Sequence, residues 1–218
     1  MHYRILIWLW LAAGCVPGVF ASDMAAERVA RLRGKLEQGL HGMKTLQADF
    51  VQTRNFRSLD AEWIARGSMV LAEARMAWIV EKPMLCCFLL TRENAGQWDE
   101  DSGKVLELNV KDQPWLKVMY ESFNSWFRGD LAVLERDFVL SATAGGERTL
   151  RMTPRSGTFY ADWVKQLELG FDPEFRYAET IRIEEKNGDL VTIALQHVKI
   201  NQTIPETVWR IPPVLKKP

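Results

Sequence analysis

The chain has 218 residues, a length that fits a single domain with a substantial hydrophobic core. Its 28 lysine and arginine residues balance 28 aspartate and glutamate residues, and 47% of the residues are hydrophobic. This neutral balance gives no electrostatic reason to bind nucleic acid, so we exclude that class of function. The modest size and neutral charge predict a monomer.

The N-terminus has the layout of a secretory signal. A short cationic start ends at Arg4, and an apolar run follows over residues 5–11. Glycine and proline interrupt the apolar stretch before it reaches the roughly 20 residues that span a bilayer. Small side chains before Ser22 predict cleavage there, so residues 1–21 are the expected signal peptide. Residues 22–218 then form one domain, exported to the periplasm.

A second interpretation of the N-terminus concerns Cys15. The sequence Ala12-Ala13-Gly14-Cys15 loosely resembles a lipobox, in which the cysteine becomes the lipidated first residue. The usual leucine three residues before the cysteine is missing, because Leu11 lies one place too early. Lipidation would make the chain an outer-membrane-anchored lipid acceptor instead of a shuttle.

The sequence contains no recognisable catalytic or metal-binding motif. Neither His41 nor His197 lies in a compact metal-ligand spacing, and His197 is expected to be a satisfied structural histidine in a strand. No nucleophile elbow or phosphate-binding glycine loop occurs. Cys86 and Cys87 are adjacent, so they cannot link distant segments and are expected to fill an apolar strand. We therefore predict no enzyme activity, no cofactor and no metal.

The first predicted element is a helix. Leucine and valine recur at three- and four-residue spacing over residues 25–40, with charged residues between them. Asp23 is the expected N-cap, and Gly42 follows the predicted end. Beyond Lys44 the apolar period changes to two, which predicts strands.

The second half of the chain predicts antiparallel hairpins. One hairpin joins residues 167–171 to 175–177 through the turn Asp172-Pro173-Glu174. The next joins residues 181–183 to 191–195 through Asn187-Gly188, a pair that tolerates positive φ. This succession indicates an antiparallel sheet, without the βαβ alternation of nucleotide-binding folds.

Residues 115–134 interrupt this alternation. Apolar residues recur there at helical spacing and include many methionine and aromatic side chains: Leu116, Met119, Tyr120, Phe123, Phe127, Leu131 and Leu134. Such side chains suit a surface that adapts to flexible partners. The alternative is an ordinary helix packed on one face of the sheet. Residues 214–218 are expected to form a disordered tail.

Several short motifs together resemble the LolA family of periplasmic lipoprotein carriers. They occur in the family's order and span nearly all of residues 22–218. They are Leu46–Gln52 (LQADFVQ), Gly67–Leu71, Met76–Trp78 with Lys82-Pro83, Trp98-Asp99, and Val208–Pro213 (VWRIPP).

The resemblance implies an α+β fold. Its sheet would be antiparallel and strongly curved, forming an open half β-barrel with an N-terminal helix. A helical lid, residues 115–134, would cover an apolar cavity. It also implies a non-enzymatic carrier that takes an acylated lipoprotein from an inner-membrane ABC transporter to an outer-membrane acceptor. A protein-binding sensor module of the same half-barrel type is the alternative function.

One family feature differs here. The family has a lid-locking arginine in an Arg-Pro pair about six residues before the strand tryptophan, whereas this chain has Ala72 at that spacing. Arg75 is the nearest candidate for the lid lock, and no proline follows it. The missing Arg-Pro pair would fit a relative of the family that carries another lipid.

Transport of an acyl chain through water requires enclosure. About fifteen methylenes cost roughly 12 kcal/mol when exposed, and full recovery of that energy would prevent release. We therefore expect a loosely packed pocket with strand residues as walls and helix residues as lid. The expected walls are Phe50, Trp78, Val80 and Trp98, and the expected lid residues are Met119, Phe123 and Phe127. The alternative for each is ordinary packed core.

Overall fold

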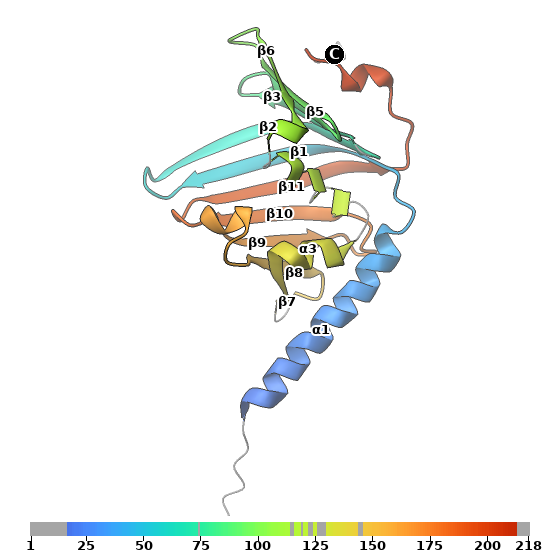
Figure 1. Ribbon diagram of the computed structural model, residues 1–218, viewed down its shortest axis with the longest axis vertical. Helices are drawn as coiled ribbons and strands as arrows, with labels where there is room; N and C mark the ends of the chain where they lie inside the picture. The colour runs from blue at the N-terminus through green and yellow to red at the C-terminus, as the bar shows by residue number, and fades with distance from the viewer. Residues whose placement is uncertain are drawn as a thin grey trace, which may run out of the picture.

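The computed structural model describes residues 17–73, 75–113, 116–118, 120–121, 124–125, 130–143 and 146–212. Its centre is one eleven-stranded antiparallel sheet (Figure 1) in the order β6-β5-β4-β3-β2-β1-β11-β10-β9-β8-β7. The sheet is curved and does not close, because β6 and β7 lie at opposite ends of this order. The predicted open half-barrel with an N-terminal helix is confirmed.

The chain forms two groups of strands, joined at the centre of the sheet by β1 and β11. The strands of the first group and their bounds are β1 (Thr45–Phe56), β2 (Ala61–Ala72), β3 (Arg75–Lys82), β4 (Cys86–Thr91), β5 (Asn94–Asp99) and β6 (Val105–Asn109). Those of the second are β7 (Phe138–Ala142), β8 (Thr149–Pro154), β9 (Val164–Phe171), β10 (Ala178–Glu185) and β11 (Leu190–Ile200). The described helices are α1 (Pro17–Leu40), α3 (Leu131–Asp137), η1 (Val110–Asp112), η2 (Phe159–Asp162) and η3 (Glu206–Trp209).

Helix α1 ends at Leu40 as predicted, but the expected start was wrong. The helix begins at Pro17, so Asp23 lies inside it and is not its N-cap. The helix also runs through the expected cleavage site before Ser22, and processing there stays a prediction. Figure 1 shows α1 passing the β7–β9 side and continuing beyond the sheet. Among the described helices, none is long and apolar enough to cross a membrane.

The two predicted hairpins both form, with one difference. Gly188, in the β10–β11 turn, has a φ of 91°, which explains the glycine at this place. β10 starts at Ala178 and not at Phe175. The reason is Asp172, whose carboxylate accepts the backbone N–H groups of Arg176 and Tyr177 and holds residues 172–177 as a loop.

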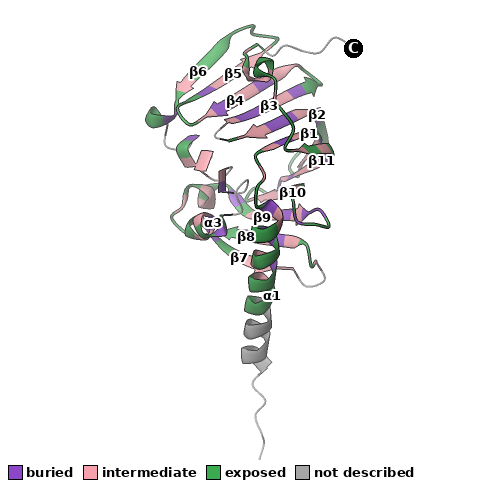
Figure 2. Cartoon of the chain, turned by 90° about the vertical axis from the view of Figure 1, so that its right-hand side faces the viewer, coloured by how far each residue is buried: buried purple, intermediate pink, exposed green. Residues whose placement is uncertain are grey.

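One face of the sheet, here called the inner face, packs against α1 and α3. Pairing registers place Leu46, Leu71, Met76 and Leu90 in one row across it. Neighbouring residues in each strand point to the opposite, outer face. Figure 2 shows buried positions concentrated along the strands, while much of α1 is exposed.

The predicted interruption lies between β6 and β7. The described residues 116–118, 120–121 and 124–125 are helical there, and α3 follows. Leu116 is fully buried against Met76, Leu90 and Ala95. The predicted lid residues Met119, Phe123 and Phe127 lie outside the described residues, as does the predicted tail 214–218.

Candidate functional site

An apolar cavity of about 70 Å³ lies between the inner face and the two helices. Leu36 and Leu40 of α1 and Leu131 and Leu134 of α3 form its helical side. Strand residues form the other side, including Leu46, Met69, Leu71, Leu169, Ile181 and Leu195. A water needs roughly 10–15 Å³ and several polar partners, so this apolar space favours a nonpolar occupant.

The cavity lies where two core clusters meet. The first cluster joins α1 and α3 to β7–β9 and includes Leu36, Leu134 and Leu169. The second joins β1, β2, β3 and β11 and includes Phe50 and Leu195. Met43, in the connection between α1 and β1, packs against both clusters and also lines the cavity. The space is therefore a packing gap at the junction of two otherwise filled regions.

Tyr177 supplies the polar group on the cavity wall. Burial raises the pKa of its phenol, and the nearby carboxylate of Asp172 raises it further. The phenol is therefore neutral at physiological pH. The other lining residues carry no charge, so the wall is suited to a hydrocarbon chain and not to a charged headgroup.

Three of the predicted wall residues lie together on the inner face, beside the cavity. The rings of Phe50 and Trp78 stack with centroids 3.9 Å apart, and Val80 packs in the same cluster. Phe50 is only 1% exposed. These side chains fill the space between them and are not among the residues that line the cavity. Their role as walls for a ligand stays a prediction.

Trp98 is placed differently from the expectation. It pairs with Cys87, which pairs with Ile79, and this register puts all three on the outer face. Trp78 pairs with Phe88 and faces inward. Successive residues of a strand point to opposite faces of the sheet. Trp98 pairs with Cys87 and not with its neighbour Phe88, so Trp98 points away from the cavity.

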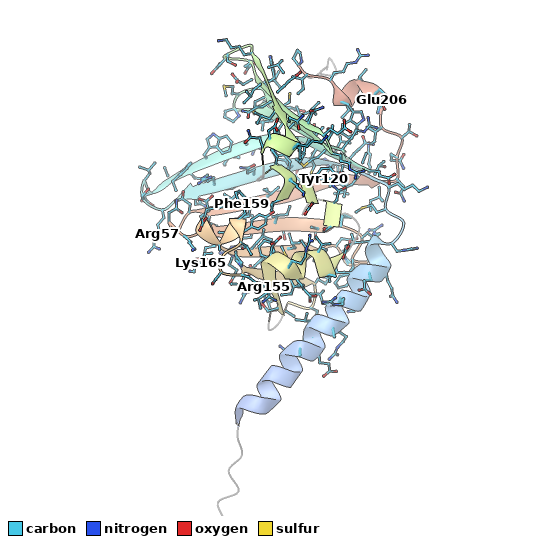
Figure 3. The ribbon with its side chains drawn as sticks, in the orientation of Figure 1. Arg57, Tyr120, Arg155, Phe159, Lys165 and Glu206 are labelled. Carbon is cyan, nitrogen blue, oxygen red and sulfur yellow. The ribbon has the colours of Figure 1, made fainter. Side chains whose placement is uncertain are left out.

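Arg75, the candidate lid lock, contacts the C-terminal segment. Its guanidinium lies 4.4 Å from the ring centroid of Trp209 and donates hydrogen bonds of 3.2–3.4 Å to the carboxylate of Glu206. Arg75 also borders a small space of about 10 Å³ beside Tyr120 and Asn124 of the insert. Figure 3 labels Glu206 in the C-terminal segment and Tyr120 in the insert. A locking role toward the insert stays a prediction.

The cysteine and histidine side chains that could react or bind a metal pack or pair as structural residues do. Among the described residues, no group of three or more His, Cys, Asp and Glu side chains is placed to hold a metal ion. Burial raises the pKa of Cys87 to about 11 and also raises that of Cys86, so both thiols are protonated. His197 is partnered, with Nδ1 2.8 Å from Asp49 Oδ2, but its side chain is 78% exposed and lies at a strand irregularity.

Sequence reasoning missed most of the cavity wall. Leu36 and Leu40 were part of the predicted helical pattern, and Ile181 and Leu195 were part of predicted strands. The pattern identified each as a core residue. It carried no signal for which core residues would face a gap, because that depends on how α1 crosses the curved sheet.

No protein-family model matches the sequence, and a search of curated proteins found no match. The fold is similar to several solved structures. An uncharacterized conserved protein from Thermus thermophilus has 11% identity and a TM-score of 0.49, over 84% of this chain and 94% of that one. A LolA superfamily protein from Nitrosomonas europaea has 10% identity and a TM-score of 0.45, over 84% and 97%.

A third similar structure is the lipoprotein LppX of Mycobacterium tuberculosis. It has 9% identity and a TM-score of 0.44, over 81% of this chain and 98% of that one. At these identities the likeness concerns the fold.

Proposed function

We propose that this chain is a non-enzymatic periplasmic carrier that shields an acyl chain of a lipoprotein or another lipid during transfer between membranes. The supporting observation is the apolar cavity at the junction of the two core clusters, whose lining residues carry no charge. A hydrocarbon chain gains by leaving water for such a space, at about 0.8 kcal/mol for each buried methylene.

The size of the cavity supports loose and reversible binding. About 70 Å³ accommodates only part of an acyl chain. A longer tail would enter when α1 and α3 move away from the sheet and expose Leu36, Leu40, Leu131 and Leu134. Breaking these helix contacts offsets part of the energy gained by burying the tail. That balance allows the carrier to release its cargo.

The proposed route of transfer crosses the periplasm from the inner to the outer membrane. Export through residues 1–21 would place the chain in the periplasm, where an inner-membrane transporter loads it and an outer-membrane acceptor unloads it. Modification of Cys15 would instead anchor the chain and make it an acceptor. Mass spectrometry of the chain recovered from the cell envelope distinguishes the form cleaved before Ser22 from the form lipidated on Cys15.

A matched pair of substitutions tests the cavity. Ala178 lines the cavity, whereas Ala194 points to the outer face of the neighbouring strand. Ala178→Phe should fill the space and weaken binding of the fluorescent fatty acid cis-parinaric acid by about tenfold, equivalent to about 1.4 kcal/mol. Ala194→Phe adds the same ring elsewhere and should leave binding unchanged.

Two results would contradict the carrier proposal. Equal binding by the parent and by Ala178→Phe would show that the acyl chain does not occupy this cavity. Recovery of a cleaved ester after incubation with a phospholipid would indicate an enzyme.

A further inference from the structure

The half-buried residues of the cavity wall mark where the cavity approaches the surface. Most lining residues, such as Leu36 and Leu134, are buried. The half-buried lining residues are Met43, Leu71, Tyr177, Ala178 and Ile181. All of these except Ile181 lie at the end of the sheet where β2 ends and β10 begins, close to the end of α1 (Figure 1). We call this end of the cavity, formed by Met43, Leu71, Tyr177 and Ala178, the mouth.

Tyr177 is the residue of the mouth whose side chain can form a strong hydrogen bond. The other mouth residues are apolar. Among the residues that the structure describes, the Tyr177 hydroxyl has no hydrogen-bond partner. The buried and unpaired side-chain polar atoms of this part of the chain are Arg54 Nε and Trp209 Nε1, so the Tyr177 hydroxyl is accessible. It can therefore donate a hydrogen bond to a ligand.

The position of Tyr177 is fixed by its neighbours. Its backbone N–H donates to the carboxylate of Asp172 at 3.2 Å, and its carbonyl accepts the Asp172 N–H at 3.2 Å. Its side chain packs against the cluster that contains Phe50 and Leu195. A hydroxyl held in this way pays little entropy when it binds a ligand, because few bonds remain to be ordered.

The charges around Tyr177 disfavour an anionic ligand group. Burial raises the pKa of its phenol most, and the charged groups that also shift this pKa are Asp172, Arg176, Glu179 and Glu174. Arg176 is already paired, with Asp172 at 2.9 Å and with Glu174 at 3.0 Å. A carboxylate at the mouth would meet three acids and no free base from this set. An uncharged carbonyl would not.

We infer that Tyr177 determines the specificity of the cavity by donating a hydrogen bond from its hydroxyl to the ester or amide carbonyl of a bound acyl chain. The inference rests on the carrier proposal and names its cargo as a neutral, ester- or amide-linked acyl chain. The hydrocarbon tail would lie among the leucines, and the carbonyl would lie at the mouth. Apolar pockets commonly orient their ligands through a single polar group of this kind. A free fatty acid still binds through its tail, but without the preferred carbonyl.

Carbon-13 NMR of a bound ester tests the inference on the unaltered full chain. The probe is methyl laurate labelled at its carbonyl carbon. A hydrogen bond to the carbonyl moves this resonance downfield of its position in hexane. We expect that shift for the ester bound to the parent and its loss in Tyr177→Phe. A bound ester whose resonance in the parent stays at the hexane position would overturn the inference.

Competition with cis-parinaric acid measures the effect on affinity. Tyr177→Phe should weaken binding of methyl laurate about fivefold, the loss of one neutral hydrogen bond, and leave binding of pentadecane unchanged. The matched control is Tyr160→Phe, because Tyr160 packs on Phe138 and does not line the cavity. It should change neither affinity.

The two proposals fail in different ways. Equal binding of methyl laurate by the parent and by Tyr177→Phe would overturn the role of Tyr177 and leave the carrier proposal standing. Failure of the parent to bind either methyl laurate or pentadecane would contradict the carrier proposal, and this inference with it.

Discussion

The half of the inner face formed by β7–β10 is covered by two helices, whereas the half formed by β1–β5 is filled mainly by its own side chains and the segment after β6. In the first half, Leu32, Leu36 and Leu134 of α1 and α3 complete the core. In the second half, the stacked rings of Phe50 and Trp78 fill the space. The cavity lies between the half covered by helices and the half filled by its own side chains.

The two halves also differ in how their loops and terminal segments are held. The helix-covered half combines buried apolar side chains with a buried carboxylate, Asp172, that fixes the loop carrying Phe175 under α1. The C-terminal segment beside the other half is held by exposed contacts such as Arg75 with Glu206. We therefore expect substitutions in the helix-covered half to lower the free energy of unfolding more than substitutions in the other half.

We expect the strongest destabilisation on substitution of Asp172, which is 1% exposed. Its carboxylate accepts hydrogen bonds from two backbone N–H groups and from the Arg176 side chain. Asp172→Ala should lower the free energy of unfolding by about 3 kcal/mol, because it leaves these donors without their partner. Urea denaturation measures the change. Asp101→Ala, at an exposed turn, is the control and should change stability by less than about 0.5 kcal/mol.

Asp172 also predicts a dependence of stability on pH. Burial raises the pKa of this carboxyl, but hydrogen bonds from Arg176 and Tyr177 outweigh burial and hold the pKa below the usual value of 3.8. The unfolded chain therefore takes up the proton first as the pH falls. The stabilisation is present above pH 3.8 and is lost as the pH falls through the lowered folded-state pKa. A parent and an Asp172→Ala variant that lose stability in parallel below that pH would contradict this.

An intermediate effect is expected at Gly39, where α1 approaches the loop of Phe175. A Cβ at Gly39 would lie 2.2 Å from the backbone carbonyl oxygen of Phe175, so the helix must shift. Gly39→Ala should cost about 2 kcal/mol. Gly34→Ala, on the same helix with no atom within 4 Å of its Cβ, should instead add about 0.5–1 kcal/mol. Thermal unfolding of both variants tests whether α1 is fixed by this contact, and equal effects would contradict it.

The smallest effect is expected at Arg75. Arg75→Ala removes the stacking on Trp209 and the exposed ion pair with Glu206, which together contribute about 1 kcal/mol. Hydrogen exchange should become faster over residues 206–209. Arg75→Lys keeps the charge and should restore part of the protection. Unchanged exchange there, together with faster release of a bound fatty acid, would favour the lid-locking role over the C-terminal contact.

Much of the fold could be predicted from the sequence, because local signals determine it. Asn187-Gly188 marked a turn that requires positive φ, and the end of α1 at Leu40 followed from the apolar spacing and Gly42. The start of α1 could not be predicted in the same way. The apolar residues before Asp23 fit both a signal peptide and the first turns of a helix.

The candidate site was harder to predict because it depends on register and packing. Trp98 was expected to face inward with Trp78, but the β3–β4 and β4–β5 pairings place it opposite Cys87 on the outer face. The cavity depends on where α1 and α3 cross the sheet. Residues such as Ile181 and Leu195 therefore look like ordinary core in the sequence.

The position of β1 beside β11 has a consequence for how the molecule assembles. The first and last strands of the chain are neighbours at the centre of the sheet, with Phe50 opposite Leu195. A chain that emerges N-terminus first can form the β1–β6 hairpins. The two groups of strands can pair with each other only after β11 has emerged. Such distant pairing slows folding. The two groups of strands therefore stay unpaired with each other for as long as β11 is missing.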